Sequence, residues 1–473
     1  MVNWWLYRKF VFVLPLAVIL MVGCTEQYST KLHQQNYDDI NNVRLATFSE
    51  SSAAQQTQTV QISEPNGVLT LSQALALALM NNPELKAFSL QVRVSQAGEL
   101  QAGLWPNPAL EVEVEDVGGS GQRSGFDAAE TTIQLSQLIE LADKRTKRKR
   151  LASLEKELAG SDYEAKRLDV LTEVSKAFIE VLAAQERLVL TEELLQLSED
   201  VLETVTKRVK ADKDSCFEKT KASVVLSNIK IQHQKAVQNL EFARKKLAST
   251  WAGKEPEFES VAGMLDPNQL SPIPSIDELT DLTAQNPDIT RWSLEIDQKK
   301  AALELEKARA VSDVTLNGGL RRFNETDDNA IVFGVSIPLP ISDRNQAGKL
   351  AAAYNLTRAR EEQRAAHIRI QMELTKAYRA LSSAHTEATE LYMNVLPRAE
   401  KVFEVSKKGY NSGQLDYLHV LDAQRILFEA KARYIDALAS YHTAKADVER
   451  LIGRSIDSEA LSKSQDRKSN IEN

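Results

Sequence analysis

The sequence predicts a mainly α-helical protein with a small β part, built from two similar halves. Two repeated motifs predict the duplication: Asn82-Pro83 and Asn286-Pro287 each close a short apolar helix pattern (287 − 83 = 204), and Ser136–Asp143 matches Ser336–Asp343 in spacing (343 − 143 = 200). Gly (18) and Pro (13) are scarce and 26% of the 473 residues are charged, which favours long helices. A period of about 200 residues is too long for a solenoid unit, whose repeats run roughly 20–50 residues. We therefore expect two structural halves, residues 67–262 and 263–461.

The N-terminal residues 1–23 have the pattern of an export signal. Arg8-Lys9 is positive, and the apolar run Phe10–Leu20 is shorter than the roughly 20 residues that span a bilayer. Gly23-Cys24 is similar to the end of a bacterial lipobox, which predicts that Cys24 becomes the lipidated first residue of the mature protein. Thr25, in place of Asp, fits sorting to the outer membrane of a Gram-negative cell. The alternative is ordinary cleavage that leaves the cysteine unmodified.

Both ends of the mature chain are polar. Residues 24–66 are rich in Gln, Ser, Thr and Asn without an apolar period, which predicts an extended tether, and residues 462–473 form a polar tail. Cys216 has no intramolecular partner once Cys24 is lipidated, so no disulfide framework is expected. The net charge of −8 argues against nucleic acid as a partner, because such binding calls for a basic face.

Four segments alternate between apolar and polar residues, as strands with two different faces do. In the first, Ala109–Glu115, the apolar residues Leu110, Val112 and Val114 alternate with Glu111, Glu113 and Glu115. The second is Thr131–Ile139, and residues 118–125 form the loop between the two. In the second half, residues 314–317 and 331–337 repeat the pattern around a loop at Phe323–Asn329.

Four strands cannot close a membrane barrel alone, because about eight is the minimum. A spanning sheet also cannot leave an edge in lipid, so several chains must share one barrel if these strands cross a membrane. Glu111, Glu113 and Glu115 then line the barrel lumen and favour cations. The alternative is a small soluble sheet that packs its apolar side against a helix.

The rest of each half reads as helix. Lys144–Lys210 contains no proline and keeps apolar residues at three- and four-residue spacing, so it predicts one helix of roughly 100 Å. Asn345–Asn411 repeats it, with a kink expected at Pro397. The remaining predicted helices are the segments Ser72–Leu104 and Ile276–Val311 before the strands and the return segments Phe217–Trp251 and Leu415–Ile452.

The two long helices end in turns at corresponding places. Gly413 ends the second one with a residue that tolerates left-handed dihedrals, and Asp212 stands at the corresponding position of the first.

Together, the lipobox, the duplicated halves, the two hairpins within helical arms and the glycine-marked tip resemble the TolC family of outer-membrane efflux channels, from about Val68 to Ile452. The segment Gln137–Arg145 is similar to the cobalt–zinc–cadmium branch, in which two glycines usually precede Lys-Arg. Ala142 and Asp143 depart from that pattern. Ser336–Ile341 is similar to the strand exit in the second half of such proteins.

The resemblance implies a homotrimer in the outer membrane. Three sets of four strands would form a twelve-stranded transmembrane β-barrel, and the helices a long α-helical barrel in the periplasm. Such channels dock onto a periplasmic adaptor and an inner-membrane pump of the resistance–nodulation–division type. Because the pump supplies the energy, no active site and no cofactor are expected.

The resemblance also implies a constriction at the periplasmic tip. His419 and Asp422 lie three residues apart, hence on one helical face, and threefold symmetry would turn them into rings that attract cations. The alternative is that Asp422 pairs with Arg425 and His419 is merely solvated. The implied adaptor contacts are the two tips, Ser412, Gly413, Gln414 and Leu415 in one and Lys213, Asp214 and Ser215 in the other.

A basic cluster, Lys144–Arg150, follows the second strand. It meets lipid headgroups if that strand descends to the periplasm, and is otherwise an ordinary solvated helix start. The six histidines show no close paired spacing and no Cys-x-x-Cys exists, so no metal site is predicted. No phosphate loop or nucleophile motif predicts an enzyme.

These features predict the outer-membrane channel of a tripartite efflux system that exports heavy-metal cations, either Co, Zn and Cd or Cu and Ag. A channel for drugs or organic solutes is the alternative within the class. A periplasmic adaptor or structural coiled-coil lipoprotein without a pore is the alternative of another class.

Overall fold

The structure is a computed structural model that describes residues 64–212, 215–265, 270 and 272–456. These residues belong to one compact unit, Ile62–Asn473. The predicted signal peptide 1–23, the lipidation site Cys24, the tip residues Lys213 and Asp214 and the tail 462–473 lie outside the described residues.

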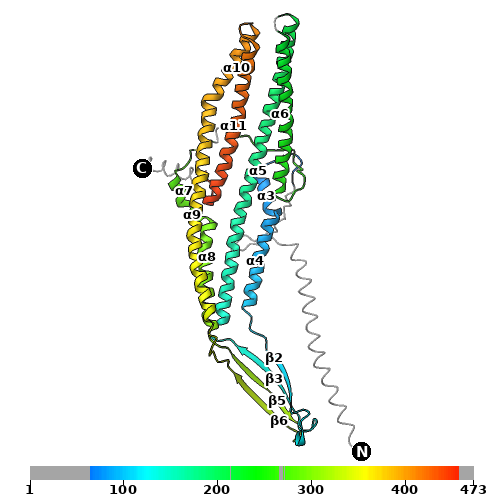
Figure 1. Cartoon of the computed structure of the whole chain (residues 1–473), viewed down its shortest axis with the longest axis vertical. Helices are drawn as coiled ribbons and strands as arrows, with labels where there is room; N and C mark the ends of the chain where they lie inside the picture. Colours follow the sequence, from blue (N-terminus) through cyan, green and yellow to red (C-terminus); the bar gives the residue numbers. More distant parts are fainter. Residues whose placement is uncertain (1–63, 213–214, 266–269, 271, 457–473) are drawn as a thin grey trace, which may run out of the picture. The chain divides into compact units, whose positions relative to one another are not determined.

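The elements of the two halves follow the same order along the chain (Figure 1). The first half contains β1 (Val68–Leu69), α3 (Leu71–Asn81), α4 (Pro83–Ala102), β2 (Ala109–Glu115), the 3₁₀ turn η1 (Gly121–Arg123), β3 (Glu130–Ile139), α5 (Lys144–Lys210), α6 (Cys216–Ser249) and β4 (Ser260–Val261). The second contains α7 (Ile276–Leu282), η3 (Thr283–Gln285), α8 (Pro287–Arg309), β5 (Val314–Phe323), β6 (Asp328–Ser336), α9 (Gln346–Glu390), the π-helical turn η4 (Leu391–Val395), α10 (Leu396–Asn411) and α11 (Tyr417–Ile452).

The repeated Asn-Pro motif forms the same joint in both halves. The Asn82 side chain caps the start of α4, accepting from Leu85 N at 2.9 Å, and its Nδ2 donates to Thr250 O at the end of α6 (2.8 Å). Asn286 caps α8 in the same way, and its Nδ2 donates to Arg450 O (3.0 Å) and Leu451 O (2.8 Å) at the end of α11. Proline follows at the first helical position, where its missing N–H costs nothing. The predicted segment Ser72–Leu104 is therefore two helices, α3 and α4, separated at the first joint.

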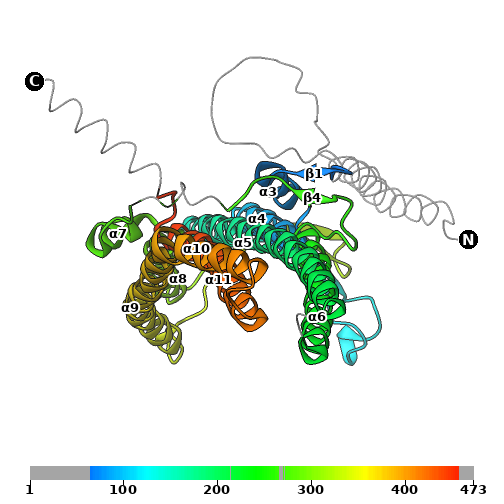
Figure 2. The same ribbon diagram turned by 90° about the horizontal axis from the view of Figure 1, so that it is seen from above.

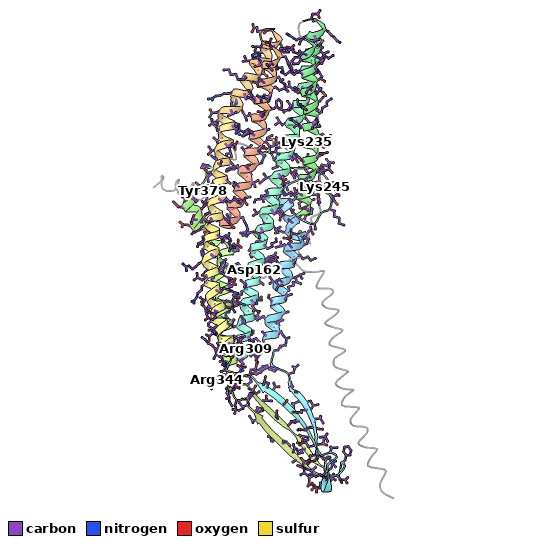
Figure 3. The ribbon with its side chains drawn as sticks, in the orientation of Figure 1. Asp162, Lys235, Lys245, Arg309, Arg344 and Tyr378 are labelled. Carbon is purple, nitrogen blue, oxygen red and sulfur yellow. The ribbon has the colours of Figure 1, made fainter. Side chains whose placement is uncertain are left out.

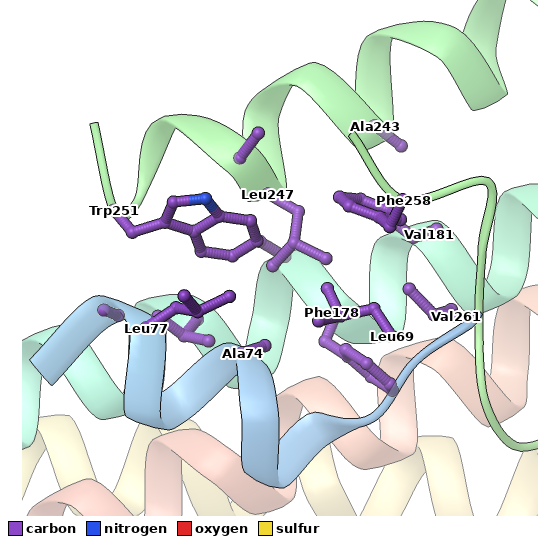
Figure 4. Close-up of a cluster of buried hydrophobic side chains, with 14 of the residues drawn as sticks. Leu69, Ala74, Leu77, Phe178, Val181, Ala243, Leu247, Trp251, Phe258 and Val261 are labelled. Carbon is purple, nitrogen blue, oxygen red and sulfur yellow. The ribbon is translucent and has the colours of Figure 1, made fainter. Parts of the chain in front are cut away.

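A hydrophobic cluster surrounds the first joint (Figure 4). Leu77 of α3, Phe178 of α5 and Leu247 of α6 pack there with Phe258, all at most 4% exposed. β1 pairs in parallel with β4, and Figure 2 shows both lying with α3 beside α5. This two-residue pairing was not predicted, because so short a strand has no periodicity to read.

The helices form a layer in which α5 is central. α5 packs against α4, α6, α8 and α11, and α9 packs against α8 and α11. α4 and α6 therefore lie at one edge of the layer, and α9 with α10, which packs on α11, lies at the other. Ion pairs join neighbouring helices across the layer, such as Arg291 Nε of α8 to Asp162 Oδ1 of α5 at 2.8 Å. Figure 3 labels Asp162 on α5.

The two long helices differ. α5 is one unbroken helix of 67 residues, as predicted. In the second half α9 passes into the π-helical turn η4 and then into α10, with Pro397 in the first turn of α10. A π turn accommodates the proline, which has no N–H to donate and whose ring crowds the preceding turn. The predicted irregularity at Pro397 is confirmed.

The four predicted strands form one antiparallel sheet in the order β2-β3-β5-β6. The inner pair, β3 and β5, joins the two halves of the chain. The predicted second loop is shorter than expected, since Phe323 pairs with Asp328 in the ladder and the turn covers only 324–327. Gly319 of β5 lets β3 approach closely, because a Cβ there would lie 2.4 Å from Ile133 O.

The apolar side of the sheet is uncovered. In one row of cross-strand neighbours Val112, Ile133, Leu320 and Ile331 are 59%, 51%, 62% and 68% exposed. No part of the described chain covers these side chains, so the alternative of a soluble sheet packed on one of the described helices is wrong. None of the described helices is both long and apolar enough to cross a membrane.

Candidate functional site

The polar face of the sheet carries the predicted glutamates. Glu111, Glu113 and Glu115 alternate along β2 with the exposed apolar residues. Gln134 of β3 lies opposite Glu111 and donates from Nε2 to its carboxylate at 2.9 Å. Within the described part of the chain, Glu113 has no ion-pair partner.

Arg321 of β5 adds a positive charge to the same face. Its Nη1 donates to Glu130 (3.0 Å) and its Nε to Thr132 Oγ1 (2.9 Å), and its Nη2 forms an ion pair with Glu115 at 3.0 Å. Neither Arg321 nor Glu130 is among the residues predicted from the sequence. A signal was available, because Arg321 follows the apolar Leu320 and so falls on the polar face of an alternating strand.

Where the strands meet the helices, Lys144 joins the two halves. It is the first residue of α5 and is 8% exposed. Its Nζ donates to Val311 O (2.5 Å) and to Asp313 Oδ1 (2.7 Å), both in the linker between α8 and β5. The same carboxylate oxygen accepts from Leu141 N at 2.9 Å.

Two other members of the basic cluster bind the end of α4. Arg145 Nε donates to Gly103 O (2.6 Å), and Arg148 donates to Ala102 O (3.0 Å) and Leu104 O (3.2 Å). These carbonyls have no partner within the helix, so the arginines satisfy them. Arg148 also pairs with Glu140 at 2.5 Å. Lys144, Arg145 and Arg148 therefore fasten the linkers and are not a freely solvated helix start.

The second half closes the same junction with a neutral side chain. Asn345 precedes α9, and its Nδ2 donates to Glu306 O of α8 at 2.8 Å and to the Glu306 carboxylate at 2.6 Å. Figure 3 labels Arg309, from the end of α8, and Arg344 at this junction. Three residues at the two junctions have left-handed backbones, Ala142 (φ 56°), Asp143 (φ 57°) and Asn345 (φ 53°). The first two stand where the resembling branch usually has glycines, the residue that adopts positive φ most easily.

Both long helices end in left-handed turns at the predicted positions. Gly413 has φ 78° and Asp212 has φ 56°, so the corresponding positions share a left-handed backbone. Ser412 and Gln414 are exposed, as the adaptor-contact prediction requires. Leu415 is only partly exposed because it packs over Gly409, where a Cβ would lie 2.6 Å from Leu415 Cδ1.

In the first tip, the Ser215 side chain caps the start of α6 by accepting from Glu218 N at 3.4 Å. The two tips touch through Arg208 of α5, which lies 4.5 Å above the Tyr410 ring and donates to Tyr410 O at 3.2 Å. Tyr417 is buried beside Tyr410, and this burial raises the pKa of its hydroxyl, with Glu218 adding to the rise.

The predicted gate residues lie near the start of α11. His419 is exposed, and Asp422 accepts from Arg425 at 2.9 Å, with more than half of each side chain of the pair in solvent. The hydrogen bond that Arg425 donates to Asp422 raises the pKa of Arg425. Within one chain, Asp422 therefore forms the local ion pair with Arg425 that the alternative interpretation predicted. The gate itself stays a prediction, because it requires more than one copy.

Asp422 also borders a groove of about 630 Å³ between α6 and α11, floored by α5. Its apolar lining includes Leu190, Ile229, Leu421 and Phe428. Among the described residues, no group of three or more His, Cys, Asp or Glu side chains is arranged to hold a metal ion.

The family model for outer membrane efflux proteins matches residues 74–253 and 279–454, one stretch in each half. The chain belongs to this family. The match confirms the predicted family, and with it a transport protein of the outer membrane.

Relatives support the assignment. The cobalt-zinc-cadmium resistance protein CzcC of Cupriavidus metallidurans is 34% identical over 391 residues, which cover 83% of this chain and 91% of that protein. The nickel-cobalt-cadmium resistance protein NccC of Alcaligenes xylosoxydans xylosoxydans is 24% identical over 305 residues, 64% of this chain and 67% of that one. The crystal structure of CusC, reported with transmembrane channel formation, matches with a TM-score of 0.70 at 16% identity, over 87% of this chain and 100% of that one. The fold class predicted from the sequence is confirmed.

Proposed function

We propose that this protein is the channel component of a tripartite efflux system that exports heavy-metal cations through the outer membrane. The proposal rests on one observation: in the described chain, neither the sheet nor the helix layer is closed at its edges. The sheet ends in the unpaired edges of β2 and β6, and one side of it is apolar and exposed. Such a sheet is stable in lipid only if its edges are closed by further strands.

The helix layer is open at both edges as well. On α6, Ala222, Ile229 and Ala236 are buried, whereas Phe217, Val224 and Ile231 are 75%, 56% and 55% exposed. The second set is offset from the first by two residues, about 200° around the helix, so it points away from α5. On α9 at the other edge, Tyr354, Ile368 and Met372 are 64–66% exposed, again two residues from the buried Ala352, Ala366 and Ile370.

Edges with complementary apolar stripes are satisfied when one edge of a copy packs on the opposite edge of the next, a head-to-tail contact that closes into a ring. Three copies give 3 × 4 = 12 strands, enough for a barrel with its apolar side outward. The polar face, with Glu111, Glu113 and Glu115, then lines the lumen, and the α5, α6 and α9–α11 arms extend into the periplasm. In this assembly Cys24 carries the lipid anchor.

We assign the remaining predicted roles within this assembly. Rings of Asp422 and His419 would form the periplasmic constriction, and the tips with Gly413 and Ser215 would bind the periplasmic adaptor. An inner-membrane pump of the resistance–nodulation–division type supplies the energy. The names of CzcC and NccC, two metal-resistance proteins, and the carboxylates of the polar face support metal cations as cargo.

Conductance tests the channel. Purified full-length protein added to a planar lipid bilayer should produce discrete current steps in potassium chloride. Protein that inserts without any current would contradict a pore and favour a non-conducting coiled-coil lipoprotein.

A deletion strain tests the cargo. Loss of the gene should lower tolerance to cobalt, zinc or cadmium salts and leave tolerance to drugs and organic solutes unchanged, and a plasmid copy should restore it. Normal metal tolerance with new drug sensitivity would replace metal cations by organic solutes as the cargo.

A further inference from the structure

The charges on the polar face are not spread evenly along the strands. β2 runs from the helix end at Ala109 toward the hairpin turn after Glu115. Glu111 therefore lies nearest the helices, Glu113 lies in one row with Thr132 and Arg321, and Glu115 and Glu130 lie in the next row, at the hairpin end. In the proposed channel, a solute that leaves the cell passes Glu111 first and the group formed by Arg321, Glu115, Glu130 and Thr132 last.

Three side-chain oxygens, one each from Glu115, Glu130 and Thr132, lie around the guanidinium of Arg321. Glu115 and Glu130 each place Oε2 3.0 Å from neighbouring guanidinium nitrogens of Arg321, and Thr132 places Oγ1 2.9 Å from Nε. Thr132 is 1% exposed, so its hydroxyl contacts the guanidinium from the buried side. The Arg321 side chain is 29% exposed, so solvent still reaches it. Two carboxylates and a hydroxyl are the kind of oxygen ligands that divalent cations take.

We propose that Arg321 is a specificity-determining residue of the channel: its fixed charge fills a place where Glu115, Glu130 and Thr132 would otherwise hold a divalent cation. This inference rests on the proposed function. A guanidinium does not lose its proton and cannot dissociate, so it blocks the site permanently. Conduction requires that an ion is attracted into the pore and still leaves it.

The contrast with Glu111 and Glu113 supports this role of Arg321. Glu111 is bound by the neutral amide of Gln134, and Glu113 has no ion pair in the described structure. Both carboxylates lie on the polar face without an ion-pair partner in the described structure and can attract cations, but neither has a second carboxylate bridged to it. Arg321 thus places a positive charge toward the hairpin end of the polar face, where cations leave the proposed channel, whereas Glu111 attracts them at the helix end.

Cobalt block of the conductance tests the inference. In potassium chloride the wild-type pore should be weakly sensitive to added Co²⁺. Arg321→Ala should be blocked at a concentration lower by about tenfold or more, since a site with two carboxylates replaces a filled one. The double variant Arg321→Ala, Glu130→Gln should return to wild-type sensitivity.

Arg322→Ala is the matched control. It removes the next arginine of the same strand, which faces the other side of the sheet and pairs with Asp327, so it should not change the block. Equal block in Arg321→Ala and wild type would overturn the inference, and the same gain in Arg322→Ala would reduce it to a general charge effect and overturn it too.

Calorimetry keeps the test independent of conductance. In detergent, Arg321→Ala should bind Co²⁺ and the wild type and the double variant should not, with all variants keeping the wild-type circular dichroism spectrum. Absence of the new site would overturn the inference, whatever the currents show. A wild type that carries no current while Arg321→Ala gains the site would instead reject the channel and retain the site.

Discussion

The two halves of this chain share their joints and differ in their arms. Asn82 and Asn286 each start the helix that leads to the strands and bind the end of the return helix of their own half. The arms differ, because α5 is unbroken whereas the corresponding helix of the second half is interrupted at η4 and Pro397. The difference teaches that duplication preserved the contacts that fix each half and allowed the long helix of the second half to become irregular.

The largest expected effect concerns the junction between helices and strands. Lys144→Met removes one partner of a buried ion pair and leaves Asp313 unpaired, which should lower the free energy of unfolding by about 3 kcal/mol. In the second half Asn345 is a neutral donor to the Glu306 carboxylate and backbone, so Asn345→Ala should lower the free energy of unfolding less, by about 1.5–2 kcal/mol. Chemical denaturation of detergent-solubilised protein measures both. The double variant Lys144→Met, Asp313→Leu should recover part of the loss, and equal effects of the two single variants would contradict the asymmetry.

The shared joints come second. Asn286→Ala removes a helix cap and leaves two buried carbonyls without a donor, so it should cost about 2–3 kcal/mol. Asn82→Ala should cost somewhat less, since only Thr250 O loses its donor. Asn286→Asp and Asn82→Asp are controls that keep the cap acceptor and lose the donor. A larger loss for Asn82→Ala than for Asn286→Ala in the same unfolding measurement would refute this ranking.

The tips offer a smaller, opposite pair of effects. Gly413→Ala should destabilise the protein by about 1 kcal/mol, because an L-residue is strained at positive φ. Asp212→Gly should raise stability by up to about 1 kcal/mol by relieving the same strain in the first tip. Thermal unfolding followed by circular dichroism compares the two. Shifts of the same sign would show that the turns are not equivalent.

Hydrogen exchange should show that the two long helices differ in local stability. Amides of residues 391–395 in the π turn should exchange faster than those of 191–195 in the unbroken α5, because Pro397 removes one hydrogen-bond donor from the helix. Mass spectrometry after peptic digestion resolves both segments. Equal protection would mean that the interruption does not weaken the second arm.

Much of the fold follows from local pattern. Alternation identified β2 and β3 within one residue, and proline-free apolar spacing identified α5 from end to end. Gly413 and Asp212 were recognised as equivalent because a left-handed turn has local residue preferences.

The missed features depend on pairing across long stretches of sequence. The contact of Arg321 with Glu130 requires the register of β3 on β5, and that of Lys144 with Asp313 joins segments of different halves. Neither contact produces a periodic pattern in the sequence. For the same reason the sequence identified the basic cluster but not the carbonyls that Arg145 and Arg148 bind.

The central claim is that the open sheet and the open helix layer are completed by other copies of the chain. Native mass spectrometry of the detergent-purified protein tests it most directly. The expected result is a particle that contains three chains. A monodisperse single chain that remains soluble without detergent once the N-terminal leader is removed would contradict the claim.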